Sequence, residues 1–283
     1  SGSRILPGAI AESFTSYAGY FGHSLQTKLT EFLRRGAAGS SGAVREPYAF
    51  VEKFPVPQMH VYYAQGCSLA EAYYLSVLSP YQLIVVGDPL TRPFAHFATV
   101  SLDLPALDGV LKGVVPILAR VTPATGRRIG RLELWVDGQM LKTVPAGSGL
   151  DLDTAALADG MHELRVVAVE AGPIETRSYA KRMIRVLNRG RQVALDPLPG
   201  SFHYGETIVL TGRSEGAQRV SVRQAGRVLA QTPVRGGVWR VEIATEMLGM
   251  GPVRLTAIAV YPDGGAARSE PVAFNVLPPR LLP

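Results

Sequence analysis

The spacing of hydrophobic residues along this chain changes near residue 105. Before that point, segments with helical spacing alternate with continuous apolar runs; after it, nearly every segment alternates polar and apolar residues. Between Ser24 and Gly36 the apolar residues recur every three or four positions, which predicts a helix with one apolar face. Ser24 is the expected N-cap, and Gly36 is expected to follow the C-cap. The apolar face consists of Leu25, Leu29, Phe32 and Leu33.

A second helix and a strand are predicted further along the first segment. Ser68 and Glu71 have the spacing of a capping box at the start of a helix that extends to Leu78. The apolar run Leu83–Val86 is typical of a strand that is covered on both faces of a parallel sheet. Because helix and strand alternate, the sequence predicts an α/β domain over residues 1–105.

The rest of the chain contains an internal repeat. Arg131–Gly138 matches Arg219–Gly226 at an offset of 88 residues, and Gly160–Val169 matches Gly251–Val260 at an offset of 91. In each copy the first strand runs into a tight turn, which is a hairpin signal. A repeat of about 90 residues has the size of one immunoglobulin-like sandwich. The sequence therefore predicts two all-β immunoglobulin-like sandwiches, over residues 106–190 and 191–280.

Residues 5–95 resemble the C-terminal part of a caspase-like α/β domain, most closely that of gingipain-type cysteine peptidases and related exported bacterial proteins. The resemblance is carried by the order of four segments, Thr15–Gly19, Gly39–Tyr48, Gly66–Tyr73 and Gly87–Leu90. It implies a partial parallel sheet followed by immunoglobulin-like domains. It also implies a catalytic histidine and cysteine at the ends of two strands. The cysteine-bearing strand would fall near Ile10–Gly19, which has no cysteine, and the histidine-bearing strand would precede residue 1, so this chain would lack the dyad.

Three residues are candidates for nucleophilic chemistry. Cys67, the only cysteine, is predicted close to a helix N-terminus, where a thiolate is stabilised. His23 could pair with it, and Ser16 could act as a replacement nucleophile if a base activated it. The resemblance places Cys67 away from the catalytic strand end, so a packing role is favoured. The five histidines show no metal-binding spacing, and neither a metal nor a cofactor is predicted.

Charge narrows the classes of partner. The chain has 29 Lys and Arg against 23 Asp and Glu, a formal charge of +6, in short clusters without interleaved aromatic residues. Nucleic acid is therefore not predicted as a ligand. No long apolar run indicates a transmembrane helix, whereas association with a membrane surface is left open.

The leading functional prediction is a non-catalytic structural or interaction subunit. A sheet of two or three strands would leave the predicted apolar faces in water, so a partner chain is expected to complete the α/β part. The cleaved N-terminal half of the same precursor is the simplest such partner. The predicted partner interface consists of Leu25, Leu29, Phe32, Leu83 and Val85.

Two alternatives remain. The chain could be part of a cysteine-peptidase-like hydrolase whose catalytic residues lie on an associated chain. It could instead be a cell-surface adhesin or glycan-binding module that uses Trp135 or Trp239, although packing is the expected role of both. The resemblance implies a secreted, periplasmic or cell-surface location.

Overall fold

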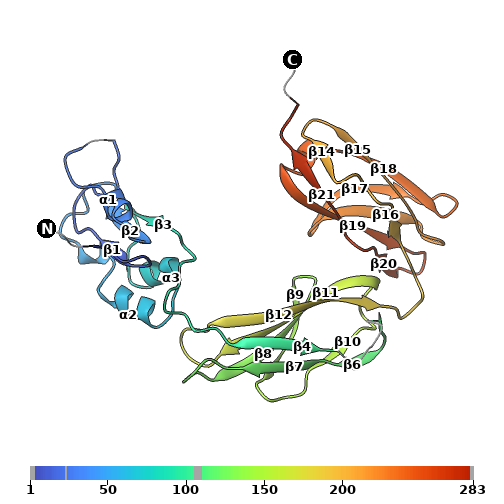
Figure 1. Cartoon of the computed structure of the whole chain (residues 1–283), viewed down its shortest axis with the longest axis horizontal. Helices are drawn as coiled ribbons and strands as arrows, with labels where there is room; N and C mark the ends of the chain where they lie inside the picture. The colour runs from blue at the N-terminus through green and yellow to red at the C-terminus, as the bar shows by residue number, and fades with distance from the viewer. Residues whose placement is uncertain (1–3, 23, 105–109, 281–283) are drawn as a thin grey trace. The chain divides into compact units, whose positions relative to one another are not determined.

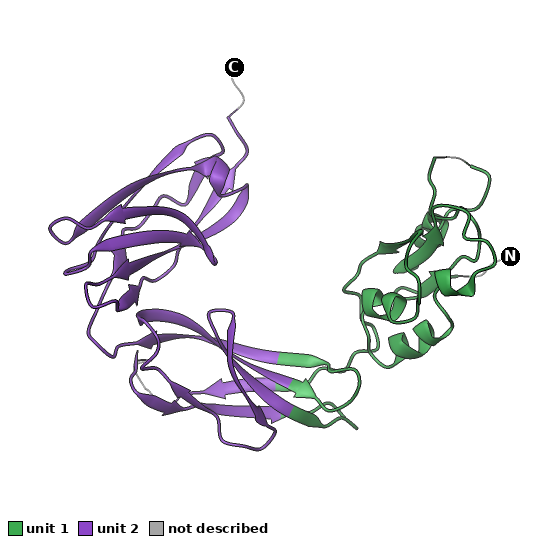
Figure 2. Cartoon of the chain, turned by 180° about the vertical axis from the view of Figure 1, so that it is seen from behind, with its two compact units in different colours: residues 1–99, 122–130, 169–178 green, residues 100–121, 131–168, 179–283 purple. Residues whose placement is uncertain are grey.

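A computed structural model describes residues 4–22, 24–104 and 110–280 (Figure 1). The chain divides into two compact units (Figure 2). Unit 1 consists of residues 1–99, 122–130 and 169–178, and unit 2 of residues 100–121, 131–168 and 179–283. The domain boundary predicted between residues 105 and 106 lies outside the described residues.

Unit 1 contains a small sheet with short helices. Its strands are β1 (Ile10–Glu12), β2 (Gly39–Ala43) and β3 (Leu83–Gly87). Its helices are α1 (Thr30–Arg34), the 3-10 helix η1 (Val51–Lys53), α2 (Gln58–Ala64) and α3 (Leu69–Tyr74).

The three strands lie in the order β1-β2-β3. β1 pairs parallel with β2, whereas β2 pairs antiparallel with β3, with Ser41 opposite Val85. The central strand β2 is buried along its whole length and consists of small residues. They are required there, because a Cβ on Gly39 would lie 2.3 Å from the Leu69 side chain.

The resemblance to a caspase- or gingipain-like domain is wrong. The structure is 9% helical and 44% strand, so the predicted α/β domain with a parallel sheet covered by helices is absent from the described residues. The Leu83–Val86 run does form a strand, β3, but this strand is only half-buried and is antiparallel to its neighbour. The prediction of a strand at this position is therefore confirmed, whereas the predicted parallel pairing and the predicted cover on both faces are wrong. An apolar run does not specify the direction of the neighbouring strand.

The helix predictions are confirmed in part. Ser68 and Glu71 form the capping box at the start of α3, with the Glu71 amide donating to Ser68 Oγ at 3.3 Å. Gly36 follows the C-cap of α1 with φ 104°, as predicted. However, α1 begins only at Thr30, and Ser24 does not cap it. The helices α2 and α3 pack through a buried cluster of Met59, Tyr63, Cys67, Leu69, Ala72 and Tyr73.

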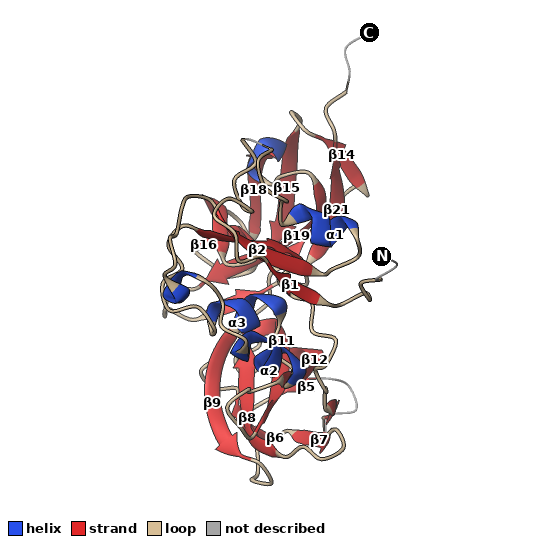
Figure 3. Cartoon of the chain, turned by 90° about the vertical axis from the view of Figure 1, so that its left-hand side faces the viewer, coloured by secondary structure: helices blue, strands red, loops and turns tan. Residues whose placement is uncertain are grey.

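In the rest of the described chain the regular secondary structure is strand, apart from one short 3-10 helix, with loops and turns between the strands (Figure 3). The first sandwich contains β4 (Thr99–Asp103), β5 (Val110–Leu111), β6 (Val114–Pro116), β7 (Leu118–Thr122), β8 (Ile129–Val136), β9 (Gln139–Pro145), β10 (Asp151–Asp153), β11 (Asp159–Glu170) and β12 (Arg177–Val186). The second contains β13 (Ala194–Leu195), β14 (Ser201–His203), β15 (Thr207–Arg213), β16 (Arg219–Gln224), β17 (Arg227–Pro233), β18 (Val238–Ala244), the 3-10 helix η2 (Thr245–Met247), β19 (Gly251–Val260), β20 (Ala266–Arg268) and β21 (Val272–Leu277).

The internal repeat is confirmed in detail. The hairpin β8–β9 corresponds to β16–β17, and the register shifts after Leu134 in one hairpin and after Val222 in the other. The turn residues Asp137 and Ala225 both have φ 51°. A shared bulge and a shared turn at one offset follow from the same alternation of residues in both copies.

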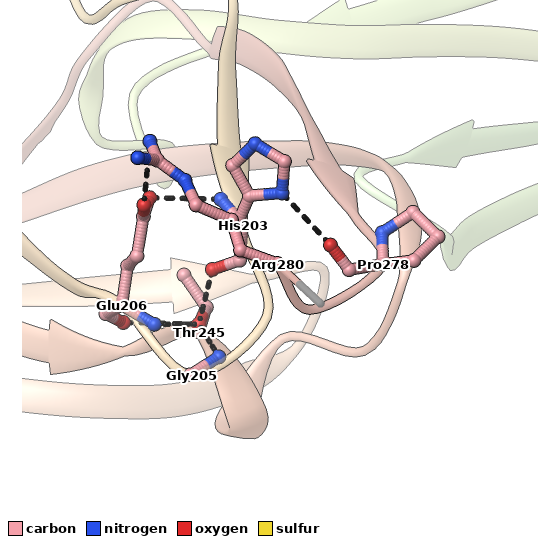
Figure 4. A network of polar contacts seen from close by, with 6 residues as sticks. All are labelled: His203, Gly205, Glu206, Thr245, Pro278 and Arg280. Atoms are coloured by element: carbon pink, nitrogen blue, oxygen red, sulfur yellow. Dashed lines mark hydrogen bonds and ion pairs between the residues drawn. The ribbon is translucent and has the colours of Figure 1, made fainter. Parts of the chain in front are cut away.

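A buried threonine holds the same loop in both sandwiches. In the second, Thr245 Oγ1 accepts hydrogen bonds from the amides of Gly205 and Glu206 at 2.9 and 3.0 Å (Figure 4). In the first, Thr154 Oγ1 lies 2.8 Å from the carbonyl oxygen of Gly113, to which it donates. Both threonines have no exposed surface. In both copies the amide of the same threonine also donates to the loop, to the carbonyl oxygen of Gly113 in the first sandwich and to that of Glu206 in the second, each at 2.9 Å.

The joint between the sandwiches, which lies within unit 2, is anchored by Asp159 at the start of β11. One carboxylate oxygen accepts the amide of Asn188 at 2.7 Å, and the other accepts the amides of Arg189 and Arg191 at 2.9 and 2.8 Å. β20 pairs parallel with this end of β11. Gly160 is required there, because its φ is 115° and a Cβ would lie 1.9 Å from the carbonyl oxygen of Arg268.

Candidate functional site

Cys67 lies in the core of unit 1, with 2% of its surface exposed. Burial raises the pKa of its thiol, and the Glu71 carboxylate adds to this effect, while Arg92 opposes it. The charged neighbours already have partners: Glu71 closes the capping box, and Arg92 donates twice to the carbonyl oxygen of Gly66, at 3.0 and 2.8 Å. A buried thiol with a raised pKa is a poor nucleophile. The structure thus gives Cys67 the surroundings of a packing residue.

We expect Cys67 to react slowly with iodoacetamide in the native protein. At neutral pH its alkylation should be at least about a hundredfold slower than in denaturant, because both burial and the small thiolate fraction oppose reaction. Mass spectrometry of timed samples measures this. Equal rates in the two conditions would contradict the burial of Cys67.

Ser16 and Cys67 line different hollows, so the described residues do not bring these two candidate nucleophiles together. Ser16 lines a separate hollow of about 470 Å³, together with Phe14, Gln26, Tyr48 and Phe54, and the lining contains no histidine. Cys67 lines a hollow of about 660 Å³, also without a histidine. His23 lies outside the described residues.

The residues of the predicted partner interface lie in different environments. Leu25 is 84% exposed, whereas Leu29 is fully buried and therefore contributes to the chain's own core. Phe32 is half-buried, as are Leu83 and Val85 on β3. A single apolar face from Leu25 to Phe32 does not form, because only its last part belongs to α1.

The two tryptophans offer little surface for stacking on a sugar. Trp239 is 3% exposed and lies in the core of the second sandwich. Trp135 is half-buried, and its Nε1 donates to Glu133 at 3.1 Å.

Glu12, at the end of β1, is a titratable residue that the sequence analysis missed. Its Oε1 atom is buried without a hydrogen-bond partner, and Ser41 donates to its other oxygen. Burial raises the pKa of Glu12 to about 7, against a smaller lowering by the Ser13 amide. This carboxyl group therefore titrates near neutral pH. An isolated glutamate in a short strand carries no sequence signal for such burial.

A cleft of about 810 Å³ lies beside the joint in unit 2. Four of its lining residues are arginines: Arg185, Arg191, Arg213 and Arg268. The β12 end, the joint, the β15 end and β20 each supply one of them. The two carboxylates in the lining, Glu215 and Glu270, leave an excess of positive charge. Leu195, Pro197 and Leu198 supply an apolar wall.

Two of the four arginines are already engaged. Arg191 pairs with Asp263 and lies over the Tyr261 ring, 4.7 Å from its centroid. Arg268 pairs with Asp137 at 3.0 Å. Arg185 and Arg213 are exposed and have no ion pair within the described part of the chain. Their guanidinium groups are free to bind an anion, and such groups bind carboxylates and sulfates in a bidentate manner.

A cluster of polar contacts around Asp137 lies near the joint. Both ring nitrogens of His162 face acceptors, the Asp137 carboxylate at 2.7 Å and the carbonyl oxygen of Ala158 at 2.8 Å. Asp137 thereby bridges His162 and Arg268, which fixes Arg268 at the edge of the cleft.

The described residues contain neither a metal-binding cluster of side chains nor a helix able to span a membrane. No group of three or more His, Cys, Asp or Glu side chains among them is arranged to hold an ion. None of the described helices has the length and apolarity needed to span a bilayer.

No protein-family model matches the sequence. No curated protein matches it either. Several solved structures match parts of the chain at low sequence identity. The fibronectin(III)-like modules of Clostridium thermocellum CbhA are 17% identical over 65% of this chain and 97% of theirs, with a TM-score of 0.28.

Two other solved structures have comparable likeness. A chimeric titin Z1Z2 tandem is 14% identical over 60% of this chain and 94% of its own, with a TM-score of 0.32. The Bacteroides ovatus mixed-linkage glucan utilization protein SGBP-B, solved with a heptasaccharide, is 12% identical over 58% of this chain and 40% of its own, with a TM-score of 0.33. The chain is predominantly a β-sandwich protein.

Proposed function

We propose that this chain is a non-catalytic binding protein that takes an acidic saccharide in the cleft beside the joint. The carrying observation is the set of four arginines around one cleft, two of them without a carboxylate partner among the described residues. Uronate or sulfate groups would pair with Arg185 and Arg213, and the apolar wall of Leu195 and Leu198 would contact the less polar face of a sugar ring.

The geometry of the joint supports a preformed cleft. The buried carboxylate of Asp159 holds the backbone of Asn188, Arg189 and Arg191 through hydrogen bonds, and β20 pairs with β11. A site that is rigid before binding loses little conformational entropy on binding. The proposal is one form of the glycan-binding alternative, with arginines taking the role first given to Trp135 and Trp239.

The binding test uses the whole chain and isothermal titration calorimetry. A uronate oligosaccharide should bind, and a neutral oligosaccharide of the same length should bind at least about tenfold more weakly, because charge-assisted hydrogen bonds are lost. Arg185→Gln and Arg213→Gln should each weaken uronate binding by about tenfold.

Arg254→Gln is the matched control, since Arg254 is an exposed arginine of β19 outside the cleft lining. This variant should bind as the parent does. Uronate binding that survives in the Arg185→Gln/Arg213→Gln double variant would overturn the proposal, as would equal affinity for the neutral oligosaccharide.

The cellular location of the protein and a partner chain for unit 1 remain predictions. More than half of the exposed large apolar side chains among the described residues belong to residues 6–97. Such a surface is typical of a region that contacts another protein. We propose a secreted, periplasmic or cell-surface location, where an acidic saccharide would be encountered.

A further inference from the structure

The strand β3 is an open edge of the sheet in unit 1. It is the last strand in the order β1-β2-β3, and no described strand pairs with its outer side. Natural edge strands are protected by charged residues, prolines or bulges. β3 has the sequence Leu-Ile-Val-Val-Gly and pairs with β2 without a register shift, so it has none of these devices between Leu83 and Gly87. Pro80 and Pro89 lie outside the strand. The other edge, β1, is shorter and carries Glu12.

The free backbone groups of β3 can be identified from the bonds on its inner side. Val44 donates to the Gln82 carbonyl oxygen at 2.8 Å, and Asp88 donates to the Ala38 carbonyl oxygen at 3.2 Å. Backbone groups of alternate residues point in opposite directions across an antiparallel sheet. The N–H and C=O groups of Val85, which lies midway between Gln82 and Asp88, therefore point away from β2.

The outward-facing backbone groups of β3 can pair with the same groups of a second β3. If two copies of β3 pair antiparallel about a two-fold axis at Val85, the two Val85 residues exchange both of their backbone hydrogen bonds. The same register places Gln82 of one copy opposite Asp88 of the other. Lys53 donates to the Gln82 side chain at 2.6 Å, so an Asp88 carboxylate would approach an ammonium group of opposite charge.

The exposed apolar residues around β3 fit the same arrangement. Tyr81 and Leu90 are each 79% exposed, and they lie just before and just after β3. Two-fold antiparallel pairing centred on Val85 brings Tyr81 of one copy beside Pro89 and Leu90 of the other. Leu78, 80% exposed, precedes Tyr81 and extends this apolar area. Within one chain, Tyr81 and Leu90 are at opposite ends of the strand and do not cover each other.

We propose that a second copy of this chain docks on β3, forming a symmetric dimer through antiparallel β3–β3 pairing. The outward-facing backbone groups of Val85 supply the central hydrogen bonds, and Tyr81 and Leu90 bury their apolar surface at both ends. The Leu83 amide already donates to the Pro80 carbonyl oxygen at 3.2 Å. The proposal is independent of the saccharide site, which lies in unit 2.

Two double variants with different charges at Tyr81 and Leu90 test the pairing. Dimerisation is measured by sedimentation velocity at protein concentrations from micromolar to about 0.3 mM, the range in which a small interface dimerises. The parent chain should show a concentration-dependent dimer. Y81E/L90E places like charges together at both ends, and should weaken dimerisation by at least about tenfold. In Y81E/L90K, the glutamate at position 81 of one copy lies beside the lysine at position 90 of the other copy. This variant should therefore retain most of the dimer.

Both substitutions are at exposed positions, so the fold should be unchanged, which circular dichroism verifies. Leu25→Glu is the matched control, because it charges another exposed leucine of unit 1 and should leave the dimer intact. A parent chain that stays monomeric throughout the range overturns the proposal. So does a dimer that Leu25→Glu disrupts but Y81E/L90E does not, or equal weakening by the two double variants.

Hydrogen exchange supplies a second readout. The Val85 amide should exchange more slowly as the protein concentration rises, and this dependence should vanish in Y81E/L90E. An exchange rate that is independent of concentration in a dimeric sample would place the contact elsewhere and overturn the proposal.

Discussion

Replacing Asp159 by alanine should destabilise the chain by on the order of 3–5 kcal/mol. Asp159 is 1% exposed, and its carboxylate accepts the amides of Asn188, Arg189 and Arg191. Alanine would remove the acceptor of all three donors from a buried position. The joint would then lose its fixed geometry, and the cleft beside it would lose its preformed shape.

Urea denaturation followed by tryptophan fluorescence measures this loss. Asp159→Asn keeps one acceptor oxygen and should lose less than alanine. Asp151→Ala, at an exposed position of β10, is the control and should change the free energy of unfolding by less than about 0.5 kcal/mol. An Asp159→Ala variant as stable as this control would show that the joint is held by other contacts.

Replacing Glu12 by glutamine should stabilise unit 1 above neutral pH by about 2–3 kcal/mol. Burial raises the pKa of Glu12 from 4.5 to about 7. Between these values the folded chain holds a proton that the unfolded chain has released, so stability falls as the pH rises through this window. Above pH 7 the folded state must keep a buried carboxylate, and glutamine removes that cost.

The free energy of unfolding of the parent and of Glu12→Gln, measured at pH 4.5 and pH 8, tests the direction of this effect. The variant should gain stability only at the higher pH, and its stability should vary less across the window than that of the parent. Glu52→Gln, an exposed position of η1, is the matched control and should leave the pH dependence unchanged. Equal stability of the Glu12 variant and the parent at pH 8 would show that water or local motion already solvates the carboxylate.

The two sandwiches were predictable from the sequence because their signals are local. Alternation of polar and apolar residues specifies a half-buried strand, and a tight turn between two such runs specifies a hairpin. The second copy reinforced the first, and the structure shows the same turn geometry at Asp137 and Ala225. The capping box at Ser68 was predictable for the same reason, since its partners are three residues apart.

Unit 1 was predicted less well because its decisive contacts are not local. The apolar run of β3 is compatible with a parallel or an antiparallel sheet, and only its pairing with β2 chose between them. The predicted helix from Ser24 shortened to Thr30–Arg34, because Leu29 packs in the core whereas Leu25 remains in water. The order of motifs that suggested a caspase-like domain did not encode strand direction either.

The arginine-lined cleft in unit 2 could not be predicted from the sequence, because it is formed by tertiary structure. Arg185, Arg191, Arg213 and Arg268 come from four separate segments, and no spacing in the sequence relates them. From the sequence alone, the basic residues formed only short clusters along the chain. The sequence by itself determined the repeat, the hairpins and the capping of α3, because each depends on residues within a few positions of one another. Only the tertiary structure decided the direction of β3, the burial of Glu12 and the convergence of the arginines, since these depend on contacts between segments far apart in the chain.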